Sequence, residues 1–193
     1  MKPFEPFAAT VAWVAALGGV VYAIAFVVLK NDPLAAGTLL VGGILTSLLM
    51  MAISISVADV NEAAARWGFV VGVVAALGSA LHGGYDLANE LHPPPALAGF
   101  GDFPKQVDPR GLATFGLAGL ALLTLTTLMS RSTRYPTGLA RLGQALGAIM
   151  IIIWLGRMII LDPNNPIVRV ALGAGVIANT AFFVWLGRVW RSG

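Results

Sequence analysis

The sequence contains no cysteine and little charge. Without cysteine, the chain can form no disulfide bond and no zinc-thiolate centre, and it has no thiol nucleophile. Charged residues make up 11% of the 193 residues, whereas soluble domains carry about a quarter. Hydrophobic residues account for 58%, and the mean hydropathy is +0.83. This balance predicts a protein of the lipid bilayer.

Clustered basic charge is also missing. The formal net charge is +3 at pH 7, but lysine and arginine are scattered between apolar runs. Nucleic-acid binding depends on a basic patch or stripe. We therefore expect no nucleic-acid partner.

Six apolar stretches are long enough to cross a hydrocarbon core about 30 Å thick, which takes about 20 helical residues. In lipid each span must pair its backbone groups internally, which favours helices. The stretches are residues 7–29, 34–58, 64–87, 112–128, 139–161 and 167–189. They predict an all-α, multi-pass integral protein of the cell membrane, in which residues 1–193 form one bundle of six transmembrane helices. Residues 88–110 are expected to form an extracytoplasmic loop within it.

The residues before several spans resemble helix starts. Asp32, Asp108 and Asn165 each precede a proline, which is the pattern of an N-cap side chain followed by proline in the first turn. These three helix starts predict three helical hairpins. Thr137 is expected to cap the fifth span in the same way.

The distribution of lysine and arginine predicts the orientation, because cytoplasmic loops usually carry the excess. With six spans, one side carries Lys2, Arg66, Arg131, Arg134, Arg141, Arg188 and Arg191, and the other carries Lys30, Lys105, Arg110, Arg157 and Arg169. Both termini are therefore expected in the cytoplasm. Arg131, Arg134 and Arg141 form a basic cluster that can contact anionic lipid but falls short of a dedicated polybasic patch.

Small residues recur at intervals of four within the spans. Close backbone contact drives helix association in lipid, and small residues permit it. The positions are Gly68, Gly72, Ala76, Ala80 and Gly84 in the third span, Gly143 and Gly147 in the fifth, and Ala171 and Gly175 in the sixth. They predict interfaces within the bundle, with a homodimer seam as the alternative.

The stretch LHGGYDLANELHPPP, residues 81–95, contains both histidines of the chain. If the third helix continues through it, His82 and Asp86 share one face at a spacing of four. Gly83 and Gly84 leave open whether the helix unwinds there. A polar site at the outer mouth of the bundle is the interpretation we favour.

Arg157 is a second candidate, because a charge within a span usually pairs or lines a cavity. Asp86 is its expected partner, and snorkelling of the guanidinium to lipid headgroups is the alternative. The predicted ligand-binding residues are His82, Tyr85, Asp86, Glu90 and Arg157.

These residues predict a binding or accessory protein rather than an enzyme, holding a lipid, a pigment, a small ligand or a partner subunit. The expected partners are membrane lipids and either a partner membrane subunit or a second copy of the chain; no cofactor is specified. No metal is expected, but a metal-dependent hydrolase is the alternative. It would use His82 and Asp86 as ligands, His92 or Glu90 to complete the set, and Glu90 as general base. Serine hydrolysis through Ser79 is disfavoured, because no GxSxG motif is present.

Three segments carry a resemblance to a group of proteins. HGGYDLAN with its proline-rich loop, VDPRGLATFG and LGRMIILDPNNP resemble segments of uncharacterised bacterial multi-spanning membrane proteins, of the domain-of-unknown-function type. The resemblance covers roughly residues 81–166. It implies location in the membrane and no particular activity.

Overall fold

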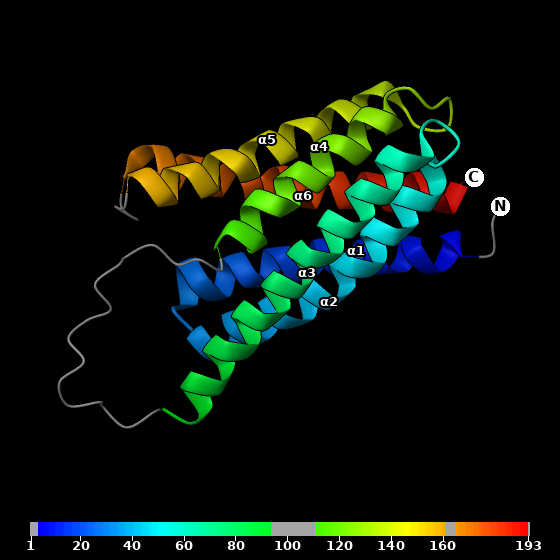
Figure 1. Cartoon of the computed structure of the whole chain (residues 1–193). Coiled ribbons are helices and arrows are strands. Elements are labelled where there is room, and N and C mark those ends of the chain that lie inside the picture. The colour runs from blue at the N-terminus through cyan, green and yellow to red at the C-terminus, as the bar shows by residue number, and fades with distance from the viewer. Residues whose placement is uncertain (1–3, 94–110, 161–164, 193) are drawn as a thin grey trace.

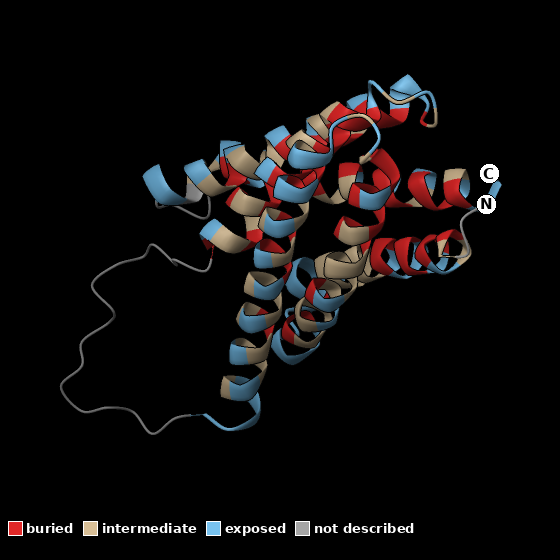
Figure 2. Cartoon of the chain, turned by 45° about the vertical axis from the view of Figure 1, so that its right-hand side comes forward, coloured by how far each residue is buried: buried red, intermediate tan, exposed pale blue. Residues whose placement is uncertain are grey.

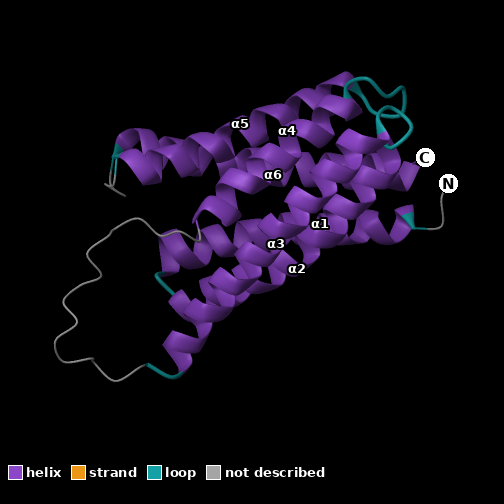
Figure 3. Ribbon diagram, in the orientation of Figure 1, coloured by secondary structure: helices purple, strands orange, loops and turns teal. Residues whose placement is uncertain are grey.

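Helices account for nearly all of the residues that the computed structural model describes, which are 4–93, 111–160 and 165–192, except for the side chain of Arg157. The elements are α1 (Glu5–Ala23), π-helical η1 (Ile24–Leu29), α2 (Asp32–Val57), α3 (Glu62–Leu91), π-helical η2 (Leu112–Leu117), α4 (Ala118–Met129), α5 (Thr137–Ile159) and α6 (Pro166–Ser192) (Figures 1 and 3). They form six helices long and apolar enough to cross a membrane, with η1 extending α1 and η2 leading into α4. The predicted all-α architecture with six candidate spans is confirmed.

Asparagine side chains start three of these helices. Asn31 accepts a hydrogen bond from the Leu34 amide at 3.0 Å, and Asn165 accepts one from the Ile167 amide at 3.0 Å. The predicted cap at Asn165 is confirmed. The prediction that Asp32 caps the second span was wrong by one residue, because the cap is Asn31. Asp32 is already the first residue of α2, and Asn31 has the non-helical backbone that a cap needs.

Two further helix starts also differ from expectation. Asn61 caps α3 by accepting a hydrogen bond from the Ala64 amide at 2.9 Å, which the sequence analysis missed. The cap predicted at Thr137 was wrong, because α5 follows Pro136 and no side chain caps it. The cap predicted at Asp108 lies outside the described residues.

The six helices form a closed ring in which each helix packs against the next and α6 packs against α1. The start of α1 and the end of α6 lie at the same end of the ring, as Figure 1 shows. We call this the terminal end; it also holds the α2–α3 and α4–α5 connections. The distal end holds the η1–α2 connection, the last turn of α3 and the start of η2.

Buried side chains gather toward the terminal end (Figure 2). In α1 they lie between Glu5 and Ala16, whereas Ala25 is the only buried residue of η1. Most of the buried residues of α2 lie between Leu49 and Val57. The α2–α3 pair diverges from the α5–α6 pair toward the distal end (Figure 1). The terminal half is therefore the packed core.

Glycine allows the backbones of α2 and α3 to approach each other. A Cβ atom placed on Gly43 would lie 2.6 Å from the amide nitrogen of Ala80 and 2.7 Å from the carbonyl oxygen of Ala76. Gly83 faces α2 in return, because a Cβ there would lie 2.5 Å from the carbonyl oxygen of Ala36. No side chain larger than hydrogen fits these two positions without moving a helix.

The other small residues also pack inside the chain. A Cβ on Gly72 would meet the Met50 side chain at 2.7 Å, and one on Gly147 would meet the carbonyl oxygen of Gly119 at 2.9 Å. Gly175 faces Ile153 of α5. The prediction of interfaces within the bundle is confirmed at these positions, because each of these glycines packs against another helix of the same chain.

Gly43→Ala is expected to lower the stability of the bundle by about 1–3 kcal/mol, because α2 and α3 must separate to accept the methyl group. Gly42→Ala is the matched control, since a Cβ on this neighbouring glycine would meet nothing within 4 Å. There alanine is expected to leave the stability unchanged or raise it by up to about 1 kcal/mol through its higher helix propensity. Thermal unfolding in detergent measures both variants, and equal effects would contradict the close approach.

Candidate functional site

The α3 helix remains continuous through the histidine-containing stretch. It runs from Glu62 to Leu91, so Gly83 and Gly84 do not unwind it. The close contact of Gly83 with the α2 backbone explains this, because it fixes the helix from outside. The helix also extends past residue 88, where the long loop was expected to begin. Residues 94–110 of that loop lie outside the described residues.

The π-helical segment η2 lies against α3 next to the histidine. Gly78 of α3 contacts Ala113 of η2 so closely that a Cβ on Gly78 would overlap it. One turn further along α3, His82 meets Thr114 of η2. Segments of π-helix are rare and are frequently found at functional sites. The glycine contact thus sets the distance at which the histidine reaches the second helix.

His82 is the centre of a small polar cluster, which we call the His82 cluster: His82, Asp86 and Thr114. The His82 Nε2 atom lies 3.3 Å from Asp86 Oδ2, and its Nδ1 atom lies 3.4 Å from Thr114 Oγ1. Only 12% of the His82 side chain is exposed, against 39% for Asp86. Each ring nitrogen thus contacts one polar group, Asp86 on α3 and Thr114 on η2.

The other predicted site residues lie further out. Tyr85 is 59% exposed, and Glu90 and His92 are exposed near the end of α3. At about 1.5 Å per residue, Glu90 lies about 12 Å and His92 about 15 Å beyond His82 along the helix axis. The structure therefore brings His82 and Asp86 together and leaves Glu90 and His92 separate. The predicted Asp86–Arg157 pair lies outside the described residues.

Within the described residues, no third histidine or acidic side chain lies close enough to His82 and Asp86 to complete a metal site. No three histidine or acidic side chains within the described parts of the chain are grouped closely enough to hold a metal ion. A catalytic zinc site needs three protein ligands. The Ser79 hydroxyl donates a hydrogen bond to the carbonyl oxygen of Ala75 at 3.2 Å, its own helix four residues back. What the cluster offers is one imidazole, one carboxylate and one hydroxyl, which suit hydrogen bonding to a polar group.

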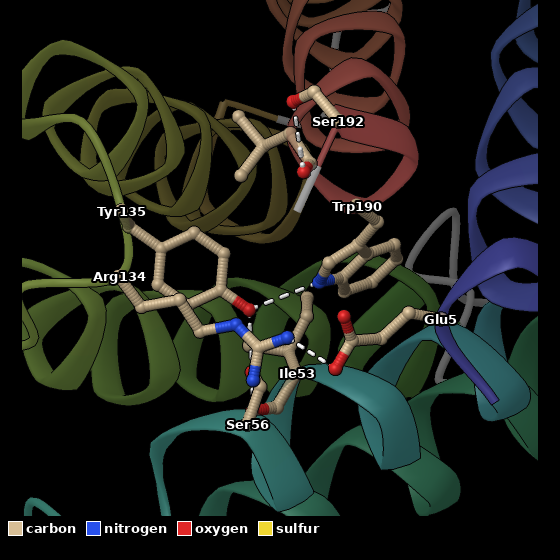
Figure 4. Close-up of polar contacts among 8 residues, drawn as sticks. Glu5, Ile53, Ser56, Arg134, Tyr135, Trp190 and Ser192 are labelled. Carbon is tan, nitrogen blue, oxygen red and sulfur yellow. Dashed lines mark hydrogen bonds and ion pairs between the residues drawn. The ribbon is translucent and has the colours of Figure 1, made fainter. Parts of the chain in front are cut away.

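A second polar network, at the terminal end, was missed by the sequence analysis. Arg134 in the α4–α5 connection forms an ion pair with Glu5, whose side chain is only 10% exposed. Tyr135 donates a hydrogen bond to the Ser56 hydroxyl at 2.5 Å and accepts one from the Trp190 indole at 3.0 Å (Figure 4). These contacts join α1, α2, α6 and the α4–α5 connection. We call these five residues the terminal clamp.

Arg134 was grouped with Arg131 and Arg141 as a contact for anionic lipid, but its partner in the structure is an acidic side chain of the same chain. Its guanidinium lies 5.9 Å from the centre of the Tyr135 ring and is paired with Glu5. The signal in the sequence was Glu5, an acidic residue just before the first span, on the same predicted side as the three arginines of residues 131–141, a stretch without an acidic residue.

Two residues of the terminal clamp, Arg134 and Tyr135, have shifted pKa values. Burial and the hydrogen bond from Arg134 to Glu5 act in opposite directions on the pKa of Arg134, and the bond together with nearby charges raises it above its usual value. Burial raises the pKa of Tyr135 and outweighs its hydrogen bonds to Ser56 and Trp190. The phenol therefore stays neutral, and the clamp has a structural role.

Tyr135→Phe is expected to destabilise the protein by about 1–3 kcal/mol, because the indole N–H of Trp190 loses its acceptor in a site that water does not reach. Trp190 is only 1% exposed. In a Trp190→Phe background, Tyr135→Phe should cost less than it does in the unmodified protein, since no indole N–H is then left without an acceptor. Unfolding in detergent measures this double-mutant cycle, and additive effects would show that the hydrogen bond contributes nothing.

No family model, curated protein or solved structure matches the chain. Conclusions about its function therefore depend on the geometry of the His82 cluster and on the membrane-spanning fold.

Proposed function

We propose that this chain is an integral membrane binding or accessory protein, whose polar site lies at the distal end of the bundle around His82. The observation that carries the proposal is the His82 cluster itself. The His82 side chain is 12% exposed; it contacts Asp86 of its own helix at 3.3 Å and joins α3 to η2 through Thr114 at 3.4 Å, in the half of the bundle that has few buried side chains. Polar groups in lipid are costly, so their presence favours a role in binding.

The ligand is held, in this proposal, by hydrogen bonds near His82, with Tyr85 and Glu90 at the rim and Arg157 as the cationic member. The imidazole, the carboxylate and the hydroxyl of the cluster are hydrogen-bonding groups of the kind that a polar headgroup, a pigment substituent or a partner helix needs. The surrounding spans supply the apolar surface that such a ligand or a partner subunit needs.

The orientation forms part of the proposal. The terminal end holds most of the arginines, among them Arg66, Arg131, Arg141, Arg188 and Arg191, so we place both termini in the cytoplasm. The three helical hairpins then turn at the outer surface, and the His82 cluster faces outward.

Labelling with a membrane-impermeant maleimide tests the orientation, because the chain has no cysteine of its own. Pro93→Cys, exposed at the distal end, is expected to react in intact cells. Ser130→Cys, exposed at the terminal end, should react only after the membrane is permeabilised. The reverse pattern would place the His82 cluster in the cytoplasm.

Mass spectrometry of the protein purified in mild detergent tests the binding role. A small molecule or partner chain is expected to co-purify with the unmodified protein and to fall several-fold in His82→Ala and in Asp86→Asn. His92→Ala is the matched control, since this exposed histidine lies outside the cluster, and it should retain the bound molecule.

Three outcomes would count against this proposal. One is that nothing co-purifies, and another is that the same molecules remain in all variants. The third is stoichiometric zinc or iron that disappears in His82→Ala, which would favour the metal-dependent hydrolase instead.

A further inference from the structure

The outward face of α6 carries a groove at the terminal end, away from the His82 cluster. It has a volume of about 780 Å³. The lining residues are Trp13 of α1 and Ala181, Val184, Trp185, Arg188, Val189, Arg191 and Ser192 of α6. Ala181, Trp185 and Arg188 are exposed on α6, which is a candidate membrane span, so the groove lies on a face of the bundle that lipid can reach.

Two tryptophans form the walls of the groove, and glycines seat them. Trp13 packs on Gly187, where any Cβ would overlap its ring, and its indole N–H donates to the carbonyl oxygen of Val184 at 3.4 Å. Trp185 packs on Gly138 of α5, whose Cβ would lie 2.8 Å from the ring. The indoles remain 37% and 39% exposed, so both are fixed yet accessible from outside. Tryptophan favours the level of the lipid headgroups.

The groove is polar at one end and apolar at the other. Ala181 lies eleven residues before Ser192, about 16 Å deeper along the helix axis. Ala181 and Val184 line the deep part, and Arg188, Arg191 and Ser192 line the part next to the membrane surface. A phospholipid has the same polarity over a similar length, with its phosphate at the surface and its acyl chains below.

The charge of the groove is positive and unbalanced. No acidic side chain lines it. Within the part of the chain that the structure describes, neither Arg188 nor Arg191 forms an ion pair, whereas Arg66 pairs with Glu62 and Arg134 with Glu5. Guanidinium groups bind phosphate through paired hydrogen bonds.

We infer that this groove is a binding site for one anionic phospholipid of the leaflet at the terminal end. Arg188 and Arg191 bind the phosphate, the indoles of Trp13 and Trp185 flank the glycerol region, and Ala181 and Val184 contact an acyl chain. This site is independent of the proposed function at the His82 cluster, since the two lie at opposite ends of the bundle.

Native mass spectrometry from mild detergent measures the binding, with phosphatidylglycerol and phosphatidylcholine of the same acyl chains as probes. We expect the first phosphatidylglycerol to bind at least about tenfold more tightly than phosphatidylcholine, given two arginines near its charge. The double variant Arg188→Gln, Arg191→Gln is expected to lose this preference while its thermal unfolding stays unchanged, since both residues are exposed.

The matched control is Arg131→Gln, Arg141→Gln, which removes two exposed arginines that lie at the same end but outside the groove. It should retain the preference. Equal binding of the two lipids to the unmodified protein would overturn the inference, as would an equal loss in both double variants, which would indicate diffuse charge. Soluble glycerophosphate should not compete, and displacement of the lipid by it would assign the site to a free phosphate instead.

Discussion

The bundle depends on close contact between helix backbones. In lipid, apolar side chains gain little by leaving the acyl chains for one another, so packing of small residues must hold the helices together. Gly43 and Gly83 supply this contact reciprocally between α2 and α3, where the facing atoms are backbone atoms that cannot rotate away. The Gly78–Ala113 contact extends it from α3 to η2. The position of the His82 cluster is a consequence of these contacts, because they set the distance that the imidazole must bridge.

The two ends of the ring use polar groups in different ways. At the terminal end, Glu5 and Tyr135 are buried and Arg134 is partly buried, and their polar contacts join segments far apart in the sequence. At the distal end, the His82 cluster joins α3 to η2, and few described side chains of η1 and η2 are buried. A closed end and a sparsely packed end suit a protein that is anchored at one surface and binds at the other.

The spans could be predicted from composition because the bilayer fixes both their length and their secondary structure. The small-residue positions were also predictable, since spacing of four places them on one helix face. The partners of individual polar side chains were not. Glu5 and Arg134 are separated by most of the chain, and the choice of Asn31 over Asp32 depends on one residue's backbone angles. The sequence shows which residues are polar, but only the ring of helices decides which of them meet.

The terminal clamp and the lipid groove are connected through the rotation of α6. Successive residues turn by about 100° around a helix, so Ala181, Trp185 and Arg188 lie about 140–180° around the helix from Trp190. Tyr135 holds Trp190 inside the bundle through a hydrogen bond of 3.0 Å, and this contact fixes which face of α6 points outward. Gly187 and Gly138 then fix the two indoles on either side of that face. The same hydrogen bond that closes the terminal end therefore also presents Arg188 to the membrane surface.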